Sequence, residues 1–365
     1  MSILMQRKFR AHAVRRPART RRWLSSRVIV VLWLIVGITI APTVIHAEET
    51  LDAELDAAVE RGLAFLARQQ QRDGSFAGGG PKVAMTGLSL MAFLSAGHTP
   101  DAGRYGTVVR NAVDYLLAQA PEDGYFGKVD QSRMYGHGIV TLALAEAYGV
   151  EFDAARRARM RGVIERAIQV ILKAQEVKKS DPHAGGWRYT PEAGDSDLSL
   201  SGWNALALRA GQDIGIDVPA DPIERAVAYV LKCYTSNSPG FAYQPGRSRS
   251  LGMTGVGVLN LQLLSDRDFE QVEAAREFLA QTPASKETRF PFYSAYYATQ
   301  ATFQLGGETW ARAWGPTREW LLGSQLDDGG WPVSRTSEEP GRTYSTSMSI
   351  LTLTIPYRLL PIYQR

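Results

Sequence analysis

Cysteine is almost missing from this 365-residue chain, which contains Cys233 alone. A single cysteine excludes an intramolecular disulfide and a cysteine-based zinc cluster. Histidine is also scarce, and His98, His137 and His183 lack the spacing of metal ligands. The sequence therefore predicts neither a metal nor a cofactor. Cys233 falls late in an amphipathic segment, where we interpret it as a small core residue.

Acidic residues are absent from the first 27 positions, which hold nine basic side chains. The formal net charge of +4 belongs to this stretch, because residues 28–365 have five more acidic than basic side chains. A mildly acidic body offers no basic surface to nucleic acid, which we exclude as a partner.

Formally charged residues are also absent from residues 28–47, which are strongly apolar and end at Ala47. A basic stretch, an apolar core and a final small residue are typical of an export signal. The apolar length is also borderline for a membrane anchor. We expect residues 1–47 to be a signal peptide or an anchor, which contacts the membrane if uncleaved. Either leaves the body, residues 48–365, in the periplasm or anchored outside the cytoplasm.

Six copies of one unit fill this body, over about 55–98, 107–149, 163–212, 222–264, 271–307 and 316–363. Each has an amphipathic segment that ends near a Gln (Tyr234 in the fourth copy), a Gly/aromatic turn and a nearly uncharged apolar segment; the fifth turn, "TRFPFY" (288–293), is degenerate. This pattern predicts an outer helix followed by an inner, buried helix. Six such hairpins predict an all-α fold, an (α/α)6 toroid, with an open solenoid as the alternative.

Two of the turns, "FLARQQQRDGSF" (65–76) and "WLLGSQLDDGGW" (320–331), resemble the QW repeats of the terpenoid cyclase and protein prenyltransferase superfamily. The likeness covers nearly all of residues 55–363 and is nearest to exported bacterial proteins with squalene-cyclase and prenyltransferase repeats. It implies a toroid with a central apolar cavity that binds an isoprenoid or other apolar ligand. It also implies that Gln70, Gln325 and Trp331 are structural and tie outer helices together.

The sequence departs from the cyclases at their protonating motif, Asp-x-Asp-Asp followed by Thr. The nearest text is Asp195-Ser196-Asp197-Leu198-Ser199, which places Asp197 at the position of the acid and Leu198 at that of the third carboxylate. Triterpene cyclases also resemble two barrels side by side, whereas this chain has the length of one.

The same Asp pair stands out among the repeats. The other five have no carboxylate at these offsets from the inner segment, and basic residues such as Lys82 and Arg133 occur at this level instead. In a closed toroid all inner-helix N-termini meet at one end, where their dipoles favour anions. We therefore expect an electropositive mouth that attracts an anionic head group.

Two interpretations of the pair stay open. In the catalytic one, Asp195 and Asp197 act as an acid or as a pair of metal ligands. In the structural one, they cap the helix that begins near Leu198 and pair with Arg133 or Arg188. Capping is the more common role of an Asp before a helix.

Further candidates lie on or near the inner segments. His137 begins the second of them, as an acid or base at the mouth or as a histidine packed against Tyr135 and Tyr148. Aromatic residues either line a cavity and stabilise cations or simply fill the core. The aromatic candidates for ligand binding are Trp187, Tyr189, Trp203, Tyr293, Tyr296 and Tyr297.

Three classes of function follow. The first is a toroid that binds an isoprenoid or other apolar ligand, with cyclase or prenyl-transfer chemistry at Asp197. The second is a non-catalytic structural or protein-interaction toroid on the outer side of the cytoplasmic membrane. The third, a carbohydrate-active toroid, needs two carboxylates that flank a groove. An apolar cavity that opens beside Asp197 would favour the first class, and a filled ring would favour the second.

Overall fold

The computed structural model describes residues 41–364 without 77, 287–288 and 334–338, so most of the expected leader lies outside the described residues. The chain forms two compact units, Met1–Leu51 and Asp52–Arg365. In the first unit the described residues belong to helix α1 (Ala41–Gln69). None of the described helices is both long enough and apolar enough to span a bilayer.

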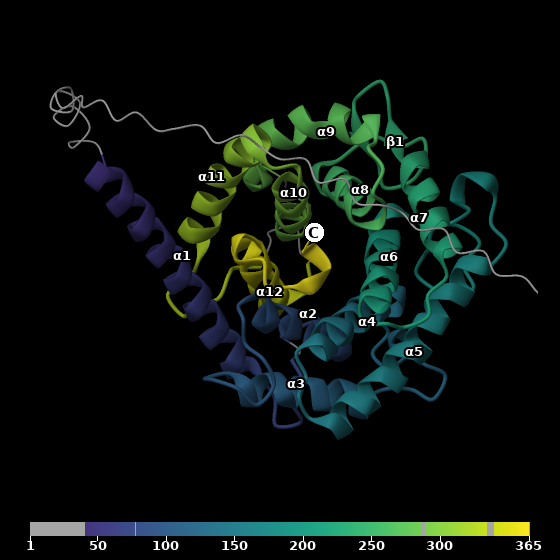
Figure 1. The fold of residues 1–365 in the computed structure, drawn as a ribbon, viewed down its shortest axis with the longest axis horizontal. Coiled ribbons are helices and arrows are strands. Elements are labelled where there is room, and N and C mark those ends of the chain that lie inside the picture. Colours follow the sequence, from purple (N-terminus) through teal and green to yellow (C-terminus); the bar gives the residue numbers. More distant parts are fainter. Residues whose placement is uncertain (1–40, 77, 287–288, 334–338, 365) are drawn as a thin grey trace, which may run out of the picture. The chain divides into compact units, whose positions relative to one another are not determined.

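The second unit is an all-α ring of two concentric layers (Figure 1). The outer helices are α1, α3 (Gly106–Ala118), α5 (Ala154–Glu176), α7 (Ala220–Lys232), α9 (Glu270–Gln281) and α11 (Gly307–Ser324). The inner helices are α2 (Lys82–Ser95), α4 (Arg133–Gly149), α6 (Leu198–Asp213), α8 (Leu251–Leu264), α10 (Pro291–Leu305) and α12 (Gly341–Leu353). Because α12 packs against α2, the ring is closed, and the predicted toroid is confirmed.

The fourth turn contains a short element that the sequence analysis did not predict. Strands β1 (Tyr234–Thr235) and β2 (Gly240–Phe241) pair antiparallel, with Tyr234 opposite Phe241. The inner helices pack closely. A Cβ added to Gly255 of α8 would lie 2.5 Å from backbone atoms of α10, so glycine is required at this contact.

The repeat signature has a physical basis in the turns. In four repeats the backbone N–H of the turn aromatic donates to a hydroxyl on the following inner helix, at 2.9–3.0 Å. These pairs are Phe76–Thr86, Trp187–Ser201, Phe241–Thr254 and Trp331–Thr346. Each turn is thereby fixed to its own inner helix.

The glutamines at the ends of outer helices make a second recurrent contact. The Nε2 atoms of Gln70, Gln175 and Gln325 each donate to the carbonyl oxygen of the turn glycine four or ten residues later. Each also donates to a carbonyl oxygen at 2.8–2.9 Å on the next outer helix. The bond from Gln325 reaches Ala58 of α1, so it joins the last outer helix to the first.

The C-terminal segment covers the end of the ring where the inner helices terminate. It contains η4 (Ile355–Tyr357), which packs against α10 and α12, and η5 (Pro361–Tyr363), which packs against α4 and α6. The C-terminus accordingly lies inside the ring in Figure 1. Ile362 and Tyr363 are buried.

Candidate functional site

Asp197 lies at the opposite end of the ring, directly before α6, and its side chain is fully buried. Its Oδ1 atom accepts from the backbone N–H of Leu200 at 3.0 Å and from the hydroxyl of Ser199 at 2.6 Å. Its Oδ2 atom accepts from Nη1 of Arg188 at 2.5 Å and from the hydroxyl of Tyr243 at 3.0 Å. Asp197 therefore caps α6 and forms a buried ion pair.

Asp195 shares the same arginine. Nε of Arg188 lies 3.1 Å from Oδ2 of Asp195, whose side chain is nearly half exposed. Arg133, the other arginine considered for this pairing, lies instead over the ring of Tyr189 at 5.7 Å from its centroid. Tyr189 also stacks on Arg188, at 4.5 Å. The corner is thus organised by Arg188, which the sequence analysis named only as a partner.

Trp187 does not face this corner as a ligand contact. Its side chain is buried, and its indole Nε1 donates at 2.8 Å to the carbonyl oxygen of Ile171 on α5. Its backbone N–H donates to Ser201 on α6. Trp187 therefore links α5 and α6 by two hydrogen bonds.

Two basic side chains of this rim, Lys82 and Arg342, are paired with acidic residues of the turns. Lys82 lies 3.5 Å from Asp73. Arg342 makes two hydrogen bonds to Asp328, which hold the pKa of that carboxyl down to about 2. At Lys82 and Arg342 the positive charge is therefore balanced locally, and an electropositive mouth as a whole stays a prediction.

Carboxylates also accept hydrogen bonds at the N-termini of two other inner helices. The comparison of residues at fixed distances from each inner segment did not reveal them. Oδ2 of Asp130 accepts from the N–H groups of Val83 and Ala84 at 2.7 and 3.1 Å. Oε1 of Glu339 accepts from those of Phe292 and Tyr293 at 3.2 and 3.4 Å. Each carboxylate belongs to the turn of the next repeat and caps the helix of the preceding one. The available signal was an acid shortly before the next inner helix.

His137 is fully buried and points away from the mouth. Its Nε2 atom lies 3.0 Å from the carbonyl oxygen of Ala167 on α5, and burial lowers the pKa of the imidazole to about 4. The ring packs on Tyr125 and Phe126 rather than on the tyrosines expected from the sequence. A neutral, packed histidine is poorly suited to act as an acid at the mouth.

The remaining aromatic candidates fill the inside of the ring. Trp203 of α6 stacks on Tyr296 of α10, with ring centroids 6.3 Å apart, and meets Tyr297 edge-on at 5.5 Å. Tyr293 lies 4.7 Å from Tyr297. Because α8 separates α6 from α10 around the ring, these contacts cross its interior. All four side chains are buried.

Two pockets within the described residues lie away from Asp197. One, of about 80 Å³, lies between α9, α10 and α11. The other, of about 10 Å³, lies under the C-terminal segment. Within the described residues, no group of three or more His, Cys, Asp or Glu could hold a metal ion.

Comparisons with known proteins agree with this architecture. The family model described as the prenyltransferase alpha-alpha toroid domain matches residues 8–291. A search of curated protein sequences found no match.

Solved structures with a similar fold have different activities. The type II terpene cyclase MstE from Scytonema is 15% identical, covers 84% of this chain and 100% of its own, and gives a TM-score of 0.56. The alpha-1,6-mannanase GH76A from Salegentibacter is 12% identical, with coverages of 83% and 99% and a TM-score of 0.59. A variant of MstE was solved with its substrate, geranylgeranyl dihydroxybenzoate. At such identities the likeness concerns the fold alone.

Proposed function

Since the chain belongs to the prenyltransferase alpha-alpha toroid family, we propose that it uses this toroid as a rigid, non-catalytic module that binds a protein partner. The observation that carries the proposal is the filled interior. Trp203, Tyr296 and Tyr297 occupy the space where an apolar ligand would lie, and each is at most 2% exposed. Close-packed aromatic side chains leave a ligand no room without rearrangement.

The state of Asp197 supports the same proposal. A general acid must present a proton to a substrate, whereas this carboxylate is buried and accepts four hydrogen bonds, one of them from its ion-pair partner Arg188. Removing one member of a buried pair leaves an uncompensated charge. Asp197 therefore has a sufficient structural reason to be present.

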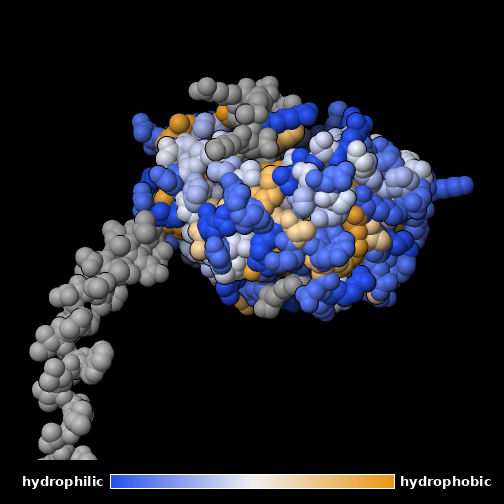
Figure 2. Space-filling model, turned by 90° about the horizontal axis from the view of Figure 1, so that it is seen from above, coloured by the Kyte–Doolittle hydropathy of each residue, from blue (hydrophilic) through white to orange (hydrophobic). Residues whose placement is uncertain are grey.

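The surface suits a module that remains in solution and meets a partner. The face in Figure 2 is mostly hydrophilic and carries small, separate apolar patches. Large apolar side chains that are exposed include Phe152, at 88%, in the loop after α4.

We place this module outside the cytoplasm, on the basis of the basic and apolar leader. A periplasmic reporter fused after residue 365 should be active, and an inactive reporter would contradict the placement.

The catalytic question is tested on the full-length protein. We expect solvent extraction and mass spectrometry to find no isoprenoid at a one-to-one ratio, and no turnover of squalene or prenyl diphosphates. The Asp197→Asn variant should behave in the same way. A stoichiometric isoprenoid, or a turnover that Asp197→Asn abolishes, would refute the non-catalytic module.

One observation favours a second function, the binding of an isoprenoid inside the ring. The interior is closed by a separate segment, which contacts the ring through the hydroxyl groups of Tyr363 and Tyr296 and through a bond from Gln304 to the Tyr363 carbonyl oxygen. Opening of this segment would expose the aromatic interior. MstE, with the same fold, has been solved with an isoprenoid substrate.

The second function has its own test. A chain that ends at Tyr357 should bind geranylgeraniol in native mass spectrometry, whereas the full-length chain should not. Circular dichroism checks that the shortened chain retains its helices. If the shortened, folded chain binds no more geranylgeraniol than the full chain, this second function is ruled out.

A further inference from the structure

In five of the six repeats the turn carries a buried aromatic ring, and Trp331 lies in a socket between three helices. Trp331 shows the arrangement. Its Nε1 atom donates to Leu321 on outer helix α11, and its N–H donates to inner helix α12. Its ring also lies 2.8 Å from the place where a Cβ on Gly62 of α1, the next outer helix, would be. The five turn rings are at most 1% exposed; they are Phe76, Phe126, Trp187, Phe241 and Trp331.

The aromatic residue in the fifth turn, Phe290, is only partly buried. After α9 ends at Gln281, the chain continues as Thr282, Pro283 and Ala284, and the short 3-10 turn η3 (Ala284–Lys286) follows. Phe290 comes nine residues after Gln281, within the 6 to 12 residues of the other repeats, but it does not line the pocket between α9, α10 and α11. The buried Ala284 lies in the wall of this pocket.

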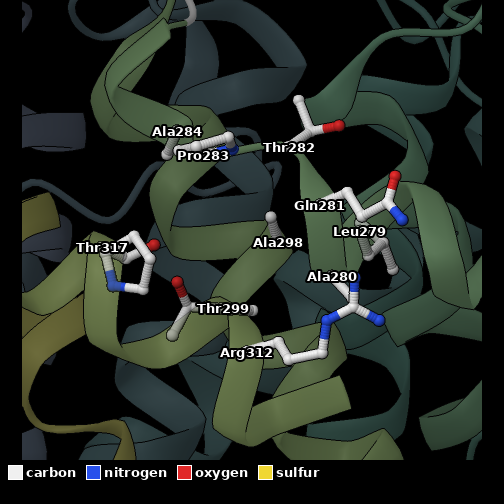
Figure 3. Close-up of a pocket in the computed structure, with 12 residues that line it drawn as sticks. Leu279, Ala280, Gln281, Thr282, Pro283, Ala284, Ala298, Thr299, Arg312 and Thr317 are labelled. Carbon is white, nitrogen blue, oxygen red and sulfur yellow. The ribbon is translucent and has the colours of Figure 1, made fainter. Parts of the chain in front are cut away.

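By its position in the repeat, this pocket corresponds to the socket that Trp331 fills in the sixth repeat, and Figure 3 shows the side chains that line it. It lies between α9, α10 and α11, the same three positions that surround Trp331 in the sixth repeat. Thr317, in its wall, stands eight residues before Gln325, as Gly62 stands eight before Gln70. The lining includes Leu279 and Ala280 from α9, Ala298 and Thr299 from α10, and Ala313 and Thr317 from α11.

Within the described residues, the glutamine of this repeat does not make the recurrent contact, and neither does Gln119 of the second repeat. The Nε2 atom of Gln281 donates to Glu277 on its own helix, whereas Gln70, Gln175 and Gln325 bond turn and next-helix carbonyl oxygens. A polypeptide that entered the socket would bring a carbonyl oxygen to Gln281. At the rim, Arg312 pairs with Glu277 at 3.0 Å and lies within reach of an entering ring.

Resting on the proposed function, we propose that this socket, formed by α9, α10 and α11, binds an aromatic side chain of a partner polypeptide. The pocket measures about 80 Å³ and opens at the surface. An enclosed apolar cavity of roughly 150 Å³ holds a free benzene molecule. The smaller, open pocket suits a ring that enters while its backbone remains outside. In the sister repeats the ring is likewise presented by a polypeptide turn.

The probe is a labelled hexapeptide with the sequence of the chain's own turn Asp327–Pro332, compared with the same peptide carrying Ala in place of Trp. Fluorescence anisotropy with the full-length protein should show saturable binding of the first peptide. Binding of the Ala peptide should be at least about tenfold weaker, since one buried aromatic contact is worth more than 1.4 kcal/mol.

Two variants fill the socket in different ways. Ala313→Phe adds a ring from α11, and Ala284→Phe supplies it from the turn itself. Each should weaken peptide binding about tenfold or more, while Ala158→Phe, on the exposed face of α5, should leave it unchanged. Circular dichroism identifies any variant that fails to fold, and the other variant then decides.

The proposal is overturned if the wild-type protein does not bind the peptide, if both peptides bind equally, or if both folded variants bind normally. These results would leave the non-catalytic toroid standing. An isoprenoid in the ring, by contrast, would refute that proposed function without affecting peptide binding at the socket.

Discussion

Glu146 gives the protein a stability that depends on pH. This residue of inner helix α4 is 3% exposed, and its Oε2 atom has a long contact of 3.5 Å with the N–H of Ile362. Burial raises the pKa of its carboxyl from 4.5 to about 8, and the charge of Asp213 acts in the same direction. The hydroxyl groups of Tyr296 and Tyr363, which lie near it, bond each other.

The direction in which stability changes with pH follows from the pKa values of Glu146 in the folded and unfolded states. Because the folded protein holds the proton more tightly than the unfolded chain, the contribution to stability is complete below pH 4.5. It decreases as pH rises and is lost at about pH 8. At about 1.4 kcal/mol per pH unit, the loss over this window is roughly 5 kcal/mol. Burial also raises the pKa of Glu339, to about 7, so this group adds to the same trend.

Urea unfolding at pH 5 and pH 8.5 tests this reasoning with Glu146→Gln. The neutral amide cannot ionise, so the variant should lose several kcal/mol less stability than the wild type between the two pH values. The control is Glu122→Gln, at an exposed position, which should follow the wild type. Parallel stability curves for the wild type and Glu146→Gln would refute the assignment.

Three further predictions concern unfolding free energies. Gln175→Ala should lower the free energy of unfolding by about 1–3 kcal/mol, because buried carbonyl groups lose their donor. Gln281→Ala should lower it by almost nothing. Equal losses for the two variants would contradict the proposed link between outer helices. Gly255→Ala should destabilise by several kcal/mol through its clash with α10, while Gly162→Ala, with only a side-chain tip at 3.6 Å, should stabilise by up to about 1 kcal/mol. Asp197→Ala should lower the free energy of unfolding by about 3–5 kcal/mol, because it breaks a buried ion pair and removes the cap of α6. A change below about 1 kcal/mol would count against the structural role.

The fold was predictable because its signals are local and repeated. Helical periodicity and Gly/aromatic turns located all twelve helices within the described part of the ring. The predicted starts of inner helices came late, as for α10, which begins at Pro291 rather than near Tyr297. Its first turn carries aromatic and small residues that do not distinguish a helix from the preceding loop.

The site was harder to predict, because its contacts join different repeats. The cap at Asp197 is local and was one of the two interpretations of the sequence. Asp130 and Glu339 cap helices that lie more than 40 residues earlier in the chain, and fixed offsets within one repeat cannot detect such contacts. Aromatic periodicity likewise does not distinguish side chains that line a cavity from side chains that fill it.

Two repeats differ from the common pattern, and the two differences have different meanings. In one the surrounding residues satisfy the changed side chains, and in the other they do not. The Asp pair of the third repeat is compensated, since Arg188 pairs with both carboxylates and α6 receives its cap. The change in the fifth repeat is not compensated: Phe290 does not line the pocket between α9, α10 and α11, so a pocket remains there, and Gln281 bonds its own helix. Burial of a Phe side chain contributes about 1.5–3 kcal/mol, which the junction of α9 and α11 lacks. A partner that supplies the ring would recover this free energy, so the uncompensated deviation is the better indicator of binding.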